Sequence, residues 1–174
     1  MYVERTTYRD EGSDKIGRRS QNIREESAVS PTEIFYVVVG LLSIVLTVYP
    51  NRHLFGGRAG GITVLEAVYY LTALAALLVG WYFNFQYMRT YGSEATWTNW
   101  TKLLFVNPAS ASGGQDLLFA NVILFPLWAF FDGRRSGMKW NWIWFPMSAL
   151  TSFAFAMALF LALKERQLRW NAAK

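Results

Sequence analysis

The sequence contains no cysteine and only one histidine, His53, among its 174 residues. Without cysteine the chain forms no disulfide and offers no thiolate to an iron–sulfur cluster or a zinc ion. A single imidazole also excludes a haem held by two histidines. We therefore predict no metal site. Since no serine–histidine–aspartate set and no paired carboxylates on one helix stand out either, we favour a protein that is not an enzyme.

Charged residues are scarce outside the N-terminal region. They make up 17% of the chain, against 53% hydrophobic and 17% aromatic residues, and six basic and seven acidic residues precede Ile34. The rest is a series of apolar stretches separated by short polar loops, which predicts an all-α integral membrane bundle. Because the N-terminal region is nearly balanced in charge, it is not a basic arm for nucleic acid, although the net charge of the chain is +5.

The first 29 residues are polar and short of branched aliphatic side chains, so we predict a tail or docking arm that does not fold alone. A transmembrane domain follows over 30–168, with a short tail at 169–174. Its first helix has a clear start, because Ser30, Pro31 and Glu33 form a capping-box sequence. We predict four spans, at about 34–49, 62–83, 114–131 and 140–163, and an interfacial helix around Trp97 and Trp100.

The loop before the second span is rich in glycine, but no lysine followed by serine or threonine comes after the glycines, so it is not a nucleotide-binding loop.

Four spans place both termini on one side of the membrane. The distribution of Lys and Arg favours that side as the inner one, whereas the dense group of Arg134, Arg135 and Lys139 argues for the opposite orientation.

Glu66 is the only charged residue of the second span, and a carboxylate inside a membrane is costly unless it has a partner. We leave three roles open: a structural one, contact with a ligand, and proton transfer. Asn84 and Gln86 follow at the far end of the same span and are candidates to hold a carbonyl group of a ligand or a backbone group. Arg134 and Arg135 are candidates for binding the anionic headgroup of a lipid or pigment.

Other polar residues have predicted structural roles. Asp116 is placed to cap the third span, and Asn121 lies within that span. Asp132 lies at the unfavourable end of the helix dipole, so we expect it to pair with Arg134 or Arg135 in a tight turn. His53 is interpreted as a loop residue, with ligation of a pigment or haem as the alternative.

Small residues recur every four positions on two spans and predict close helix packing. They are Thr72, Ala76 and Gly80 on the second span, and Ser148, Ser152 and Ala156 on the fourth, beside Ala154, Ala158 and Ala162. Such a stripe also leaves room for a flat ring or an isoprenoid chain, so a pigment or quinone in the groove is the alternative interpretation.

Four short motifs resemble a family of small bacterial and cyanobacterial membrane proteins known only as a domain of unknown function. They lie at 81–86, 106–110, 131–135 and 161–166, and the resemblance covers about 62–168. It implies three spans, so the first span and the tail are additions that look like a docking element. The family has no assigned reaction, and the resemblance suggests a photosynthetic membrane.

These observations together predict an accessory or assembly subunit of a larger membrane complex in a thylakoid or bacterial inner membrane. Its partners would be other membrane subunits and lipids, with lipid, chlorophyll, carotenoid or quinone in the helix grooves. The alternative is an intramembrane enzyme acting on an isoprenoid or lipid substrate, with Glu66, Asp116 and Asp132 as candidate acids. A small transporter is a third class, but the chain shows no internal repeat.

Overall fold

The structure is a computed structural model, which describes residues 30–173. Its contacts divide the chain into two units, 1–34 and 35–174. The tail predicted over 1–29 lies outside the described residues. Within the described part of the first unit, the capping box is confirmed: the Glu33 amide donates to Ser30 Oγ at 3.1 Å, and the Ser30 amide donates to Glu33 Oε2 at 2.8 Å.

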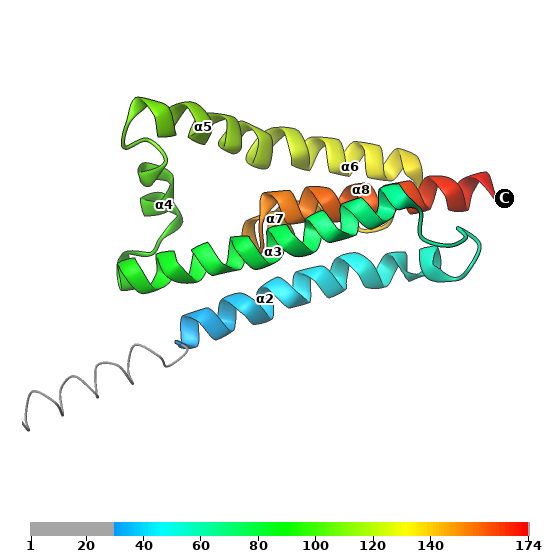
Figure 1. Cartoon of the computed structure of the whole chain (residues 1–174), viewed down its shortest axis with the longest axis horizontal. Helices are drawn as coiled ribbons and strands as arrows, with labels where there is room; N and C mark the ends of the chain where they lie inside the picture. Colours follow the sequence, from blue (N-terminus) through cyan, green and yellow to red (C-terminus); the bar gives the residue numbers. More distant parts are fainter. Residues whose placement is uncertain (1–29, 174) are drawn as a thin grey trace, which may run out of the picture. The chain divides into compact units, whose positions relative to one another are not determined.

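The described residues are helical and contain no strand, which confirms the predicted all-α class. Figure 1 shows the order of the elements. They are α2 (Pro31–Val48), η1 (Tyr49–Phe55), α3 (Val64–Tyr91), η2 (Gly92–Glu94), α4 (Trp97–Leu103), α5 (Pro108–Leu118), the π-helical η3 (Phe119–Leu124), α6 (Phe125–Ser136), η4 (Asn141–Ile143), α7 (Trp144–Leu150) and α8 (Phe153–Ala172).

Three helical segments among the described residues are long and apolar enough to cross a membrane: Pro31–Phe55, Val64–Glu94 and Pro108–Ser136. At about 1.5 Å per residue, each exceeds the roughly 30 Å of a bilayer's hydrocarbon core. The protein is therefore a membrane protein. The second and third segments are longer than the predicted spans at 62–83 and 114–131. The predicted interfacial helix therefore corresponds only to α4, which has seven residues.

The predicted fourth span, 140–163, is not one helix. It consists of η4 and α7, a break at Thr151 and Ser152, of which Ser152 is extended, and then α8. The chain enters the bundle at Lys139, which contacts Asn51 beside the end of α2, and Met147 contacts Thr47 further along α2. The segment before the break therefore runs along α2 toward the middle of the bundle.

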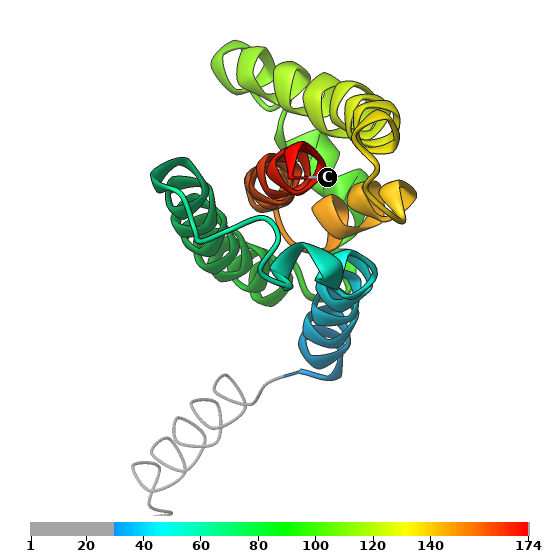
Figure 2. The same ribbon diagram turned by 90° about the vertical axis from the view of Figure 1, so that its right-hand side faces the viewer.

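After the break, α8 returns along α3 in the opposite direction (Figures 1 and 2). Ser152, just before α8, lies against Gly80 of α3, whereas Arg166 near the end of α8 pairs with Glu66 at the start of α3. We call the segment 139–173 the re-entrant hairpin. It begins and ends at the same end of the bundle, so it corrects the four predicted crossings to three helices and a hairpin.

The residues at the two ends of the bundle follow from this path. The C-terminal end carries residues 49–63, 132–143 and 164–173, and the α4 end carries the connection 92–107. In α8 only the eleven residues 153–163 form an uninterrupted apolar run, a length typical of a buried or re-entrant helix rather than a spanning one.

The hairpin supplies much of the buried core. Trp144 of α7 packs edge-to-face on Phe160 of α8 at 5.2 Å between ring centroids, and Phe125 of α6 packs on the same ring at 6.1 Å. The small residues of α8 lie partly as predicted, since Ala156, Ala158 and Ala162 are buried. Ala154 and Thr72 are exposed, so they do not belong to the packed faces.

The topology can be tested with single cysteines, because the natural chain has none. We expect a membrane-impermeant maleimide to label Gly61→Cys, Arg135→Cys and Ala173→Cys from one side of the membrane, and Ser93→Cys and Thr98→Cys only from the other. If residue 173 is labelled from the same side as residue 93, the fourth segment crosses the membrane and the hairpin is wrong.

Candidate functional site

Glu66 occupies the first turn of α3 as part of a second capping box. The Glu66 amide donates to Thr63 Oγ1 at 3.2 Å, and the Thr63 amide donates to Glu66 Oε2 at 3.1 Å. This arrangement satisfies two otherwise free amides and places a negative charge at the positive end of the helix dipole. The residue is fully buried, with 0% of its surface exposed.

Two arginines of α8 neutralise the buried carboxylate. Arg166 Nη1 lies 3.2 Å from Glu66 Oε2, and Arg169 Nη2 pairs with Glu66 Oε1. Because residues three apart on a helix share a face, both guanidinium groups approach the carboxylate from the same side. Arg166 is itself buried, with 6% exposed. One negative and two positive charges are thus brought together, and we call these three residues the arginine clamp.

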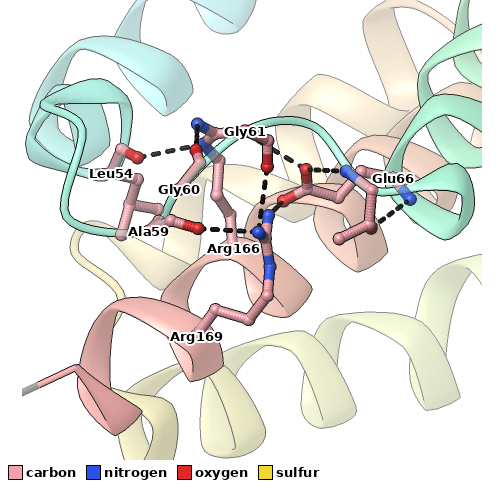
Figure 3. A network of polar contacts seen from close by, with 8 residues as sticks. Leu54, Ala59, Gly60, Gly61, Glu66, Arg166 and Arg169 are labelled. Atoms are coloured by element: carbon pink, nitrogen blue, oxygen red, sulfur yellow. Dashed lines mark hydrogen bonds and ion pairs between the residues drawn. The ribbon is translucent and has the colours of Figure 1, made fainter.

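The glycine-rich loop before α3 stabilises the excess positive charge of the arginine clamp (Figure 3). Three main-chain carbonyls of this loop and one of η1, just before it, accept four hydrogen bonds. Arg166 Nε and Nη2 donate to the carbonyls of Leu54 at 2.9 Å and Gly60 at 3.1 Å, and Arg169 Nη1 donates to those of Ala59 at 2.6 Å and Gly61 at 2.9 Å.

The polarity of this loop differs from that of a phosphate-binding loop. A phosphate site presents backbone N–H groups to an anion, whereas this loop presents carbonyl oxygens to two cations. Gly60 contributes with a φ of +72°, a conformation that favours glycine. The glycines therefore allow the loop to turn its carbonyl oxygens toward the two arginines at the end of α8. Both oxygens of Glu66 are engaged within the chain, so the site as it stands holds helices together.

A second anchor holds the beginning of the hairpin. Asn51 is completely buried, and its side chain pairs with the main chain of Lys139. Asn51 Nδ2 donates to the Lys139 carbonyl at 3.1 Å, while the Lys139 amide donates to Asn51 Oδ1 at 2.9 Å. An amide side chain matches a peptide group in this way because it carries the same donor and acceptor.

The break between α7 and α8 leaves main-chain carbonyls free in the middle of the bundle, where water is scarce and each must find a donor. Two side chains of α3 supply the donors. Trp81 Nε1 donates to the Leu150 carbonyl at 3.4 Å, and Asn84 Nδ2 donates to the Thr151 carbonyl at 3.3 Å. Asn84 also donates to the Tyr36 hydroxyl at 2.8 Å, which ties α2 to the same point.

Two glycines allow the broken chain to lie close to its neighbours. A Cβ atom at Gly80 would lie 2.8 Å from Ser152 Cβ, which is too close for any side chain. A Cβ atom at Gly40 of α2 would lie 3.3 Å from the Leu150 carbonyl oxygen. Close backbone approach at small residues is the usual basis of helix association in membranes.

The third span has a π-helical turn beside the hairpin. Pro126 lacks the amide that would continue the ladder, and the Phe125 amide instead bonds the carbonyl of Ala120, five residues earlier. Asn121 lies in this turn, and its Oδ1 accepts a hydrogen bond from Ser148 Oγ of α7 at 2.8 Å. Asn121 therefore has the structural role predicted for it.

The predicted site residues do not come together in one place. Glu66 belongs to the arginine clamp, Asn84 to the hairpin tip, and Gln86 is exposed and donates to Tyr82 Oη at 2.8 Å. Arg134 and Arg135 are exposed at the end of α6. His53 lies in η1, where Nε2 is 3.3 Å from Gln167 Oε1.

Two predicted structural roles are wrong. Asp116 is not a helix cap, because α5 begins eight residues earlier, where Asn107 Oδ1 accepts from the Ser110 amide at 2.9 Å. The proline after Asn107 fixes that start. Asp132 does not pair with Arg134 or Arg135, since α6 continues past it to Ser136. It pairs with Lys164 of α8 at 2.6 Å instead.

Sequence reasoning missed both arginines of the clamp. Arg166 follows the end of the predicted fourth span at residue 163, yet it is buried. The signal in the sequence was a lone acidic residue in one span and two arginines three positions apart after an apolar run, a charge pattern that predicts a pair across helices. Asn51 gave no comparable signal, because asparagine after proline reads as an ordinary turn.

Residues 68–166, more than half of the chain, match the family described as protein of unknown function DUF2834, so the chain belongs to this family. This confirms the resemblance to a family of unknown function. No curated protein and no solved structure matches the chain. Among residues 30–173, no group of three or more His, Cys, Asp or Glu side chains is placed to hold a metal ion.

The arginine clamp predicts a large effect of Glu66→Gln. The substitution keeps the size of the side chain but leaves two guanidinium groups without a counter-charge, so we expect a loss of about 3–5 kcal/mol in stability, measured by thermal unfolding in detergent. The matched control, Asp116→Asn, changes an exposed carboxylate and should have little effect. An unaltered unfolding temperature for Glu66→Gln would show that the clamp contributes nothing to the fold.

The contact at the hairpin tip predicts that Gly80→Ala destabilises the protein by about 1–3 kcal/mol through overpacking. Gly113→Ala on α5 is the control, because a Cβ atom there meets nothing within 4 Å. Adding Ser152→Gly to Gly80→Ala removes the clashing atom and should restore most of the stability. A neutral effect of Gly80→Ala alone would contradict the close approach of α3 and the hairpin.

Proposed function

We propose that this member of the DUF2834 family is an accessory subunit of a larger membrane protein complex in a bacterial inner membrane or a thylakoid membrane. In this role the hairpin keeps the fold rigid, and the outer faces of the long helices contact neighbouring subunits and lipids. The observation that carries the proposal is α3, whose most apolar stretch is only 11% buried. A bound chlorophyll, carotenoid or quinone stays a prediction that rests on the small-residue stripes and on the resemblance.

The exposed surface of α3 has the form of a helix-packing ridge. Leu71, Leu74, Leu78 and Tyr82 are 67%, 54%, 61% and 58% exposed, and their spacing of three and four residues places them on one face. Such a ridge fits the groove of another helix. Because α8 packs along α3 on a different face, through Ala73 and Gly80, the ridge is available to a partner helix.

The distribution of carboxylates supports a subunit over an intramembrane enzyme. Glu66 pairs with the two arginines of the clamp, and Asp132 pairs with Lys164. Asp116 lies in α5, where its Oδ1 accepts a hydrogen bond from Gln115 Nε2 at 2.5 Å. Glu66 and Asp116 lie toward opposite ends of the bundle. Acid–base catalysis on a lipid substrate needs groups that converge on the reacting atoms, so this arrangement favours a role in assembly.

A photo-crosslinking amino acid at Leu71 tests the proposal in the native membrane. We expect it to yield an adduct with one protein of defined mass, because the ridge faces a partner helix. The matched control is Leu127 of α6, which is 54% exposed on a different helix, and we expect lipid adducts there. If residue 71 yields only lipid adducts, like residue 127, the ridge faces the bilayer and the proposal fails.

A further inference from the structure

The net positive charge of the described membrane unit lies at one end. The C-terminal end carries eight basic and three acidic residues, an excess of five positive charges: Arg52, Arg58, Arg134, Arg135, Lys139, Lys164, Arg166 and Arg169, against Glu66, Asp132 and Glu165. The α4 end carries Arg89 and Lys102 against Glu94 and Asp116, so its charges balance. This asymmetry arises because the hairpin returns the chain to the end where the loops are already basic.

The acidic residues of the C-terminal end are largely occupied inside the bundle. Glu66 is enclosed by the arginine clamp, and Asp132 pairs with Lys164. The surface of this end therefore presents cations. Arg52, Arg58, Arg134, Arg135 and Lys139 are all exposed. Their chain segments are held together by the contacts of Asn51 with Lys139, of Arg58 with the Ala173 carbonyl, and of Asn171 with the Ser136 carbonyl.

Exposed aromatic residues lie in the same segments as these cations. Tyr49 is 62% exposed, and the guanidinium of Arg52 lies 4.3 Å from its ring centroid. Trp140 and Trp142, directly after Lys139, are stacked at 6.4 Å and are also exposed. Tyrosine and tryptophan concentrate at the headgroup level of membranes. The basic side chains beside them are therefore within reach of lipid phosphates.

We propose that the C-terminal end of the bundle binds anionic phospholipid headgroups of the cytoplasmic leaflet, mainly through Arg134, Arg135 and Lys139. Guanidinium groups bind phosphate through paired, charge-assisted hydrogen bonds, and basic clusters next to membrane helices attract anionic lipids. The dense group of Arg134, Arg135 and Lys139 also favours the cytoplasmic side for this end. The proposal is independent of a protein partner at α3.

The test is native mass spectrometry of the full-length protein in detergent, titrated with phosphatidylglycerol or phosphatidylcholine. We expect the wild type to bind phosphatidylglycerol preferentially, with an affinity that falls as sodium chloride is raised. The double variant Arg134→Gln/Lys139→Gln should bind phosphatidylglycerol about thirtyfold more weakly, at the strength typical of two basic side chains near an anionic surface.

The control is Arg89→Gln/Lys102→Gln, which removes one arginine and one lysine at the α4 end and should leave lipid affinity unchanged. Thermal unfolding of both double variants checks that the fold persists, and the salt dependence of the wild type supplies a test that needs no variant. The proposal is overturned if the wild type binds both lipids equally, if both double variants lose affinity alike, or if inorganic phosphate alone saturates the site. It is equally overturned if the first variant keeps its lipid but loses a protein partner.

Discussion

The carboxylate of Glu66, enclosed by Arg166 and Arg169, fixes how α8 lies against α3. A buried carboxylate is tolerated only with partners, and here both partners come from the last helix of the chain. Fourteen residues separate Glu66 from Gly80 on α3, and fourteen separate Ser152 from Arg166 on α8. The same register that pairs the charges therefore brings the one α3 residue without a side chain opposite the tip of the hairpin. The clamp and the tip depend on each other.

The hairpin tip places unwound main chain in the middle of a membrane bundle, which is possible only where protein groups satisfy it. Trp81 and Asn84 of α3 supply these groups, and the Tyr36 hydroxyl of α2 accepts a further hydrogen bond from Asn84. On the opposite side, the π-helical turn of the third span presents Asn121 to Ser148. The polar residues of the membrane interior thus serve to fold the chain back on itself. The outer surface of the bundle is left apolar along the spans and basic at the C-terminal end.

Much of the fold could be predicted from sequence, because local rules decide it. The capping-box sequence Ser30 to Glu33 predicts the start of α2, and the apolar stretches predict three of the spans. The hairpin could not be predicted, since residues 140–163 carry no charge and are mostly apolar, and neither Thr151 nor Ser152 is a helix breaker. Its break is set by tertiary contacts with Gly40, Gly80 and Asn84. For the candidate site, the sequence identifies Glu66, but its partners lie a hundred residues away, beyond the end of the predicted fourth span. The predicted roles of Asp116 and Asp132 were wrong because α5 begins before Asp116 and α6 continues past Asp132.

The clamp holds the end of α8 beside the beginning of α3, so that the last segment enters and leaves at one end of the bundle. The most direct measurement is the distance between spin labels at Gly61→Cys and Ala173→Cys, determined by pulsed electron resonance in a reconstituted bilayer. Arg58 bonds the Ala173 carbonyl, and a side chain at Gly61 meets no atom within 4 Å. We expect a separation well below the roughly 30 Å of the hydrocarbon core, because the clamp holds both labels at one end of the bundle. A separation above about 30 Å, the thickness of the hydrocarbon core, would place the two labels on opposite sides and contradict this arrangement.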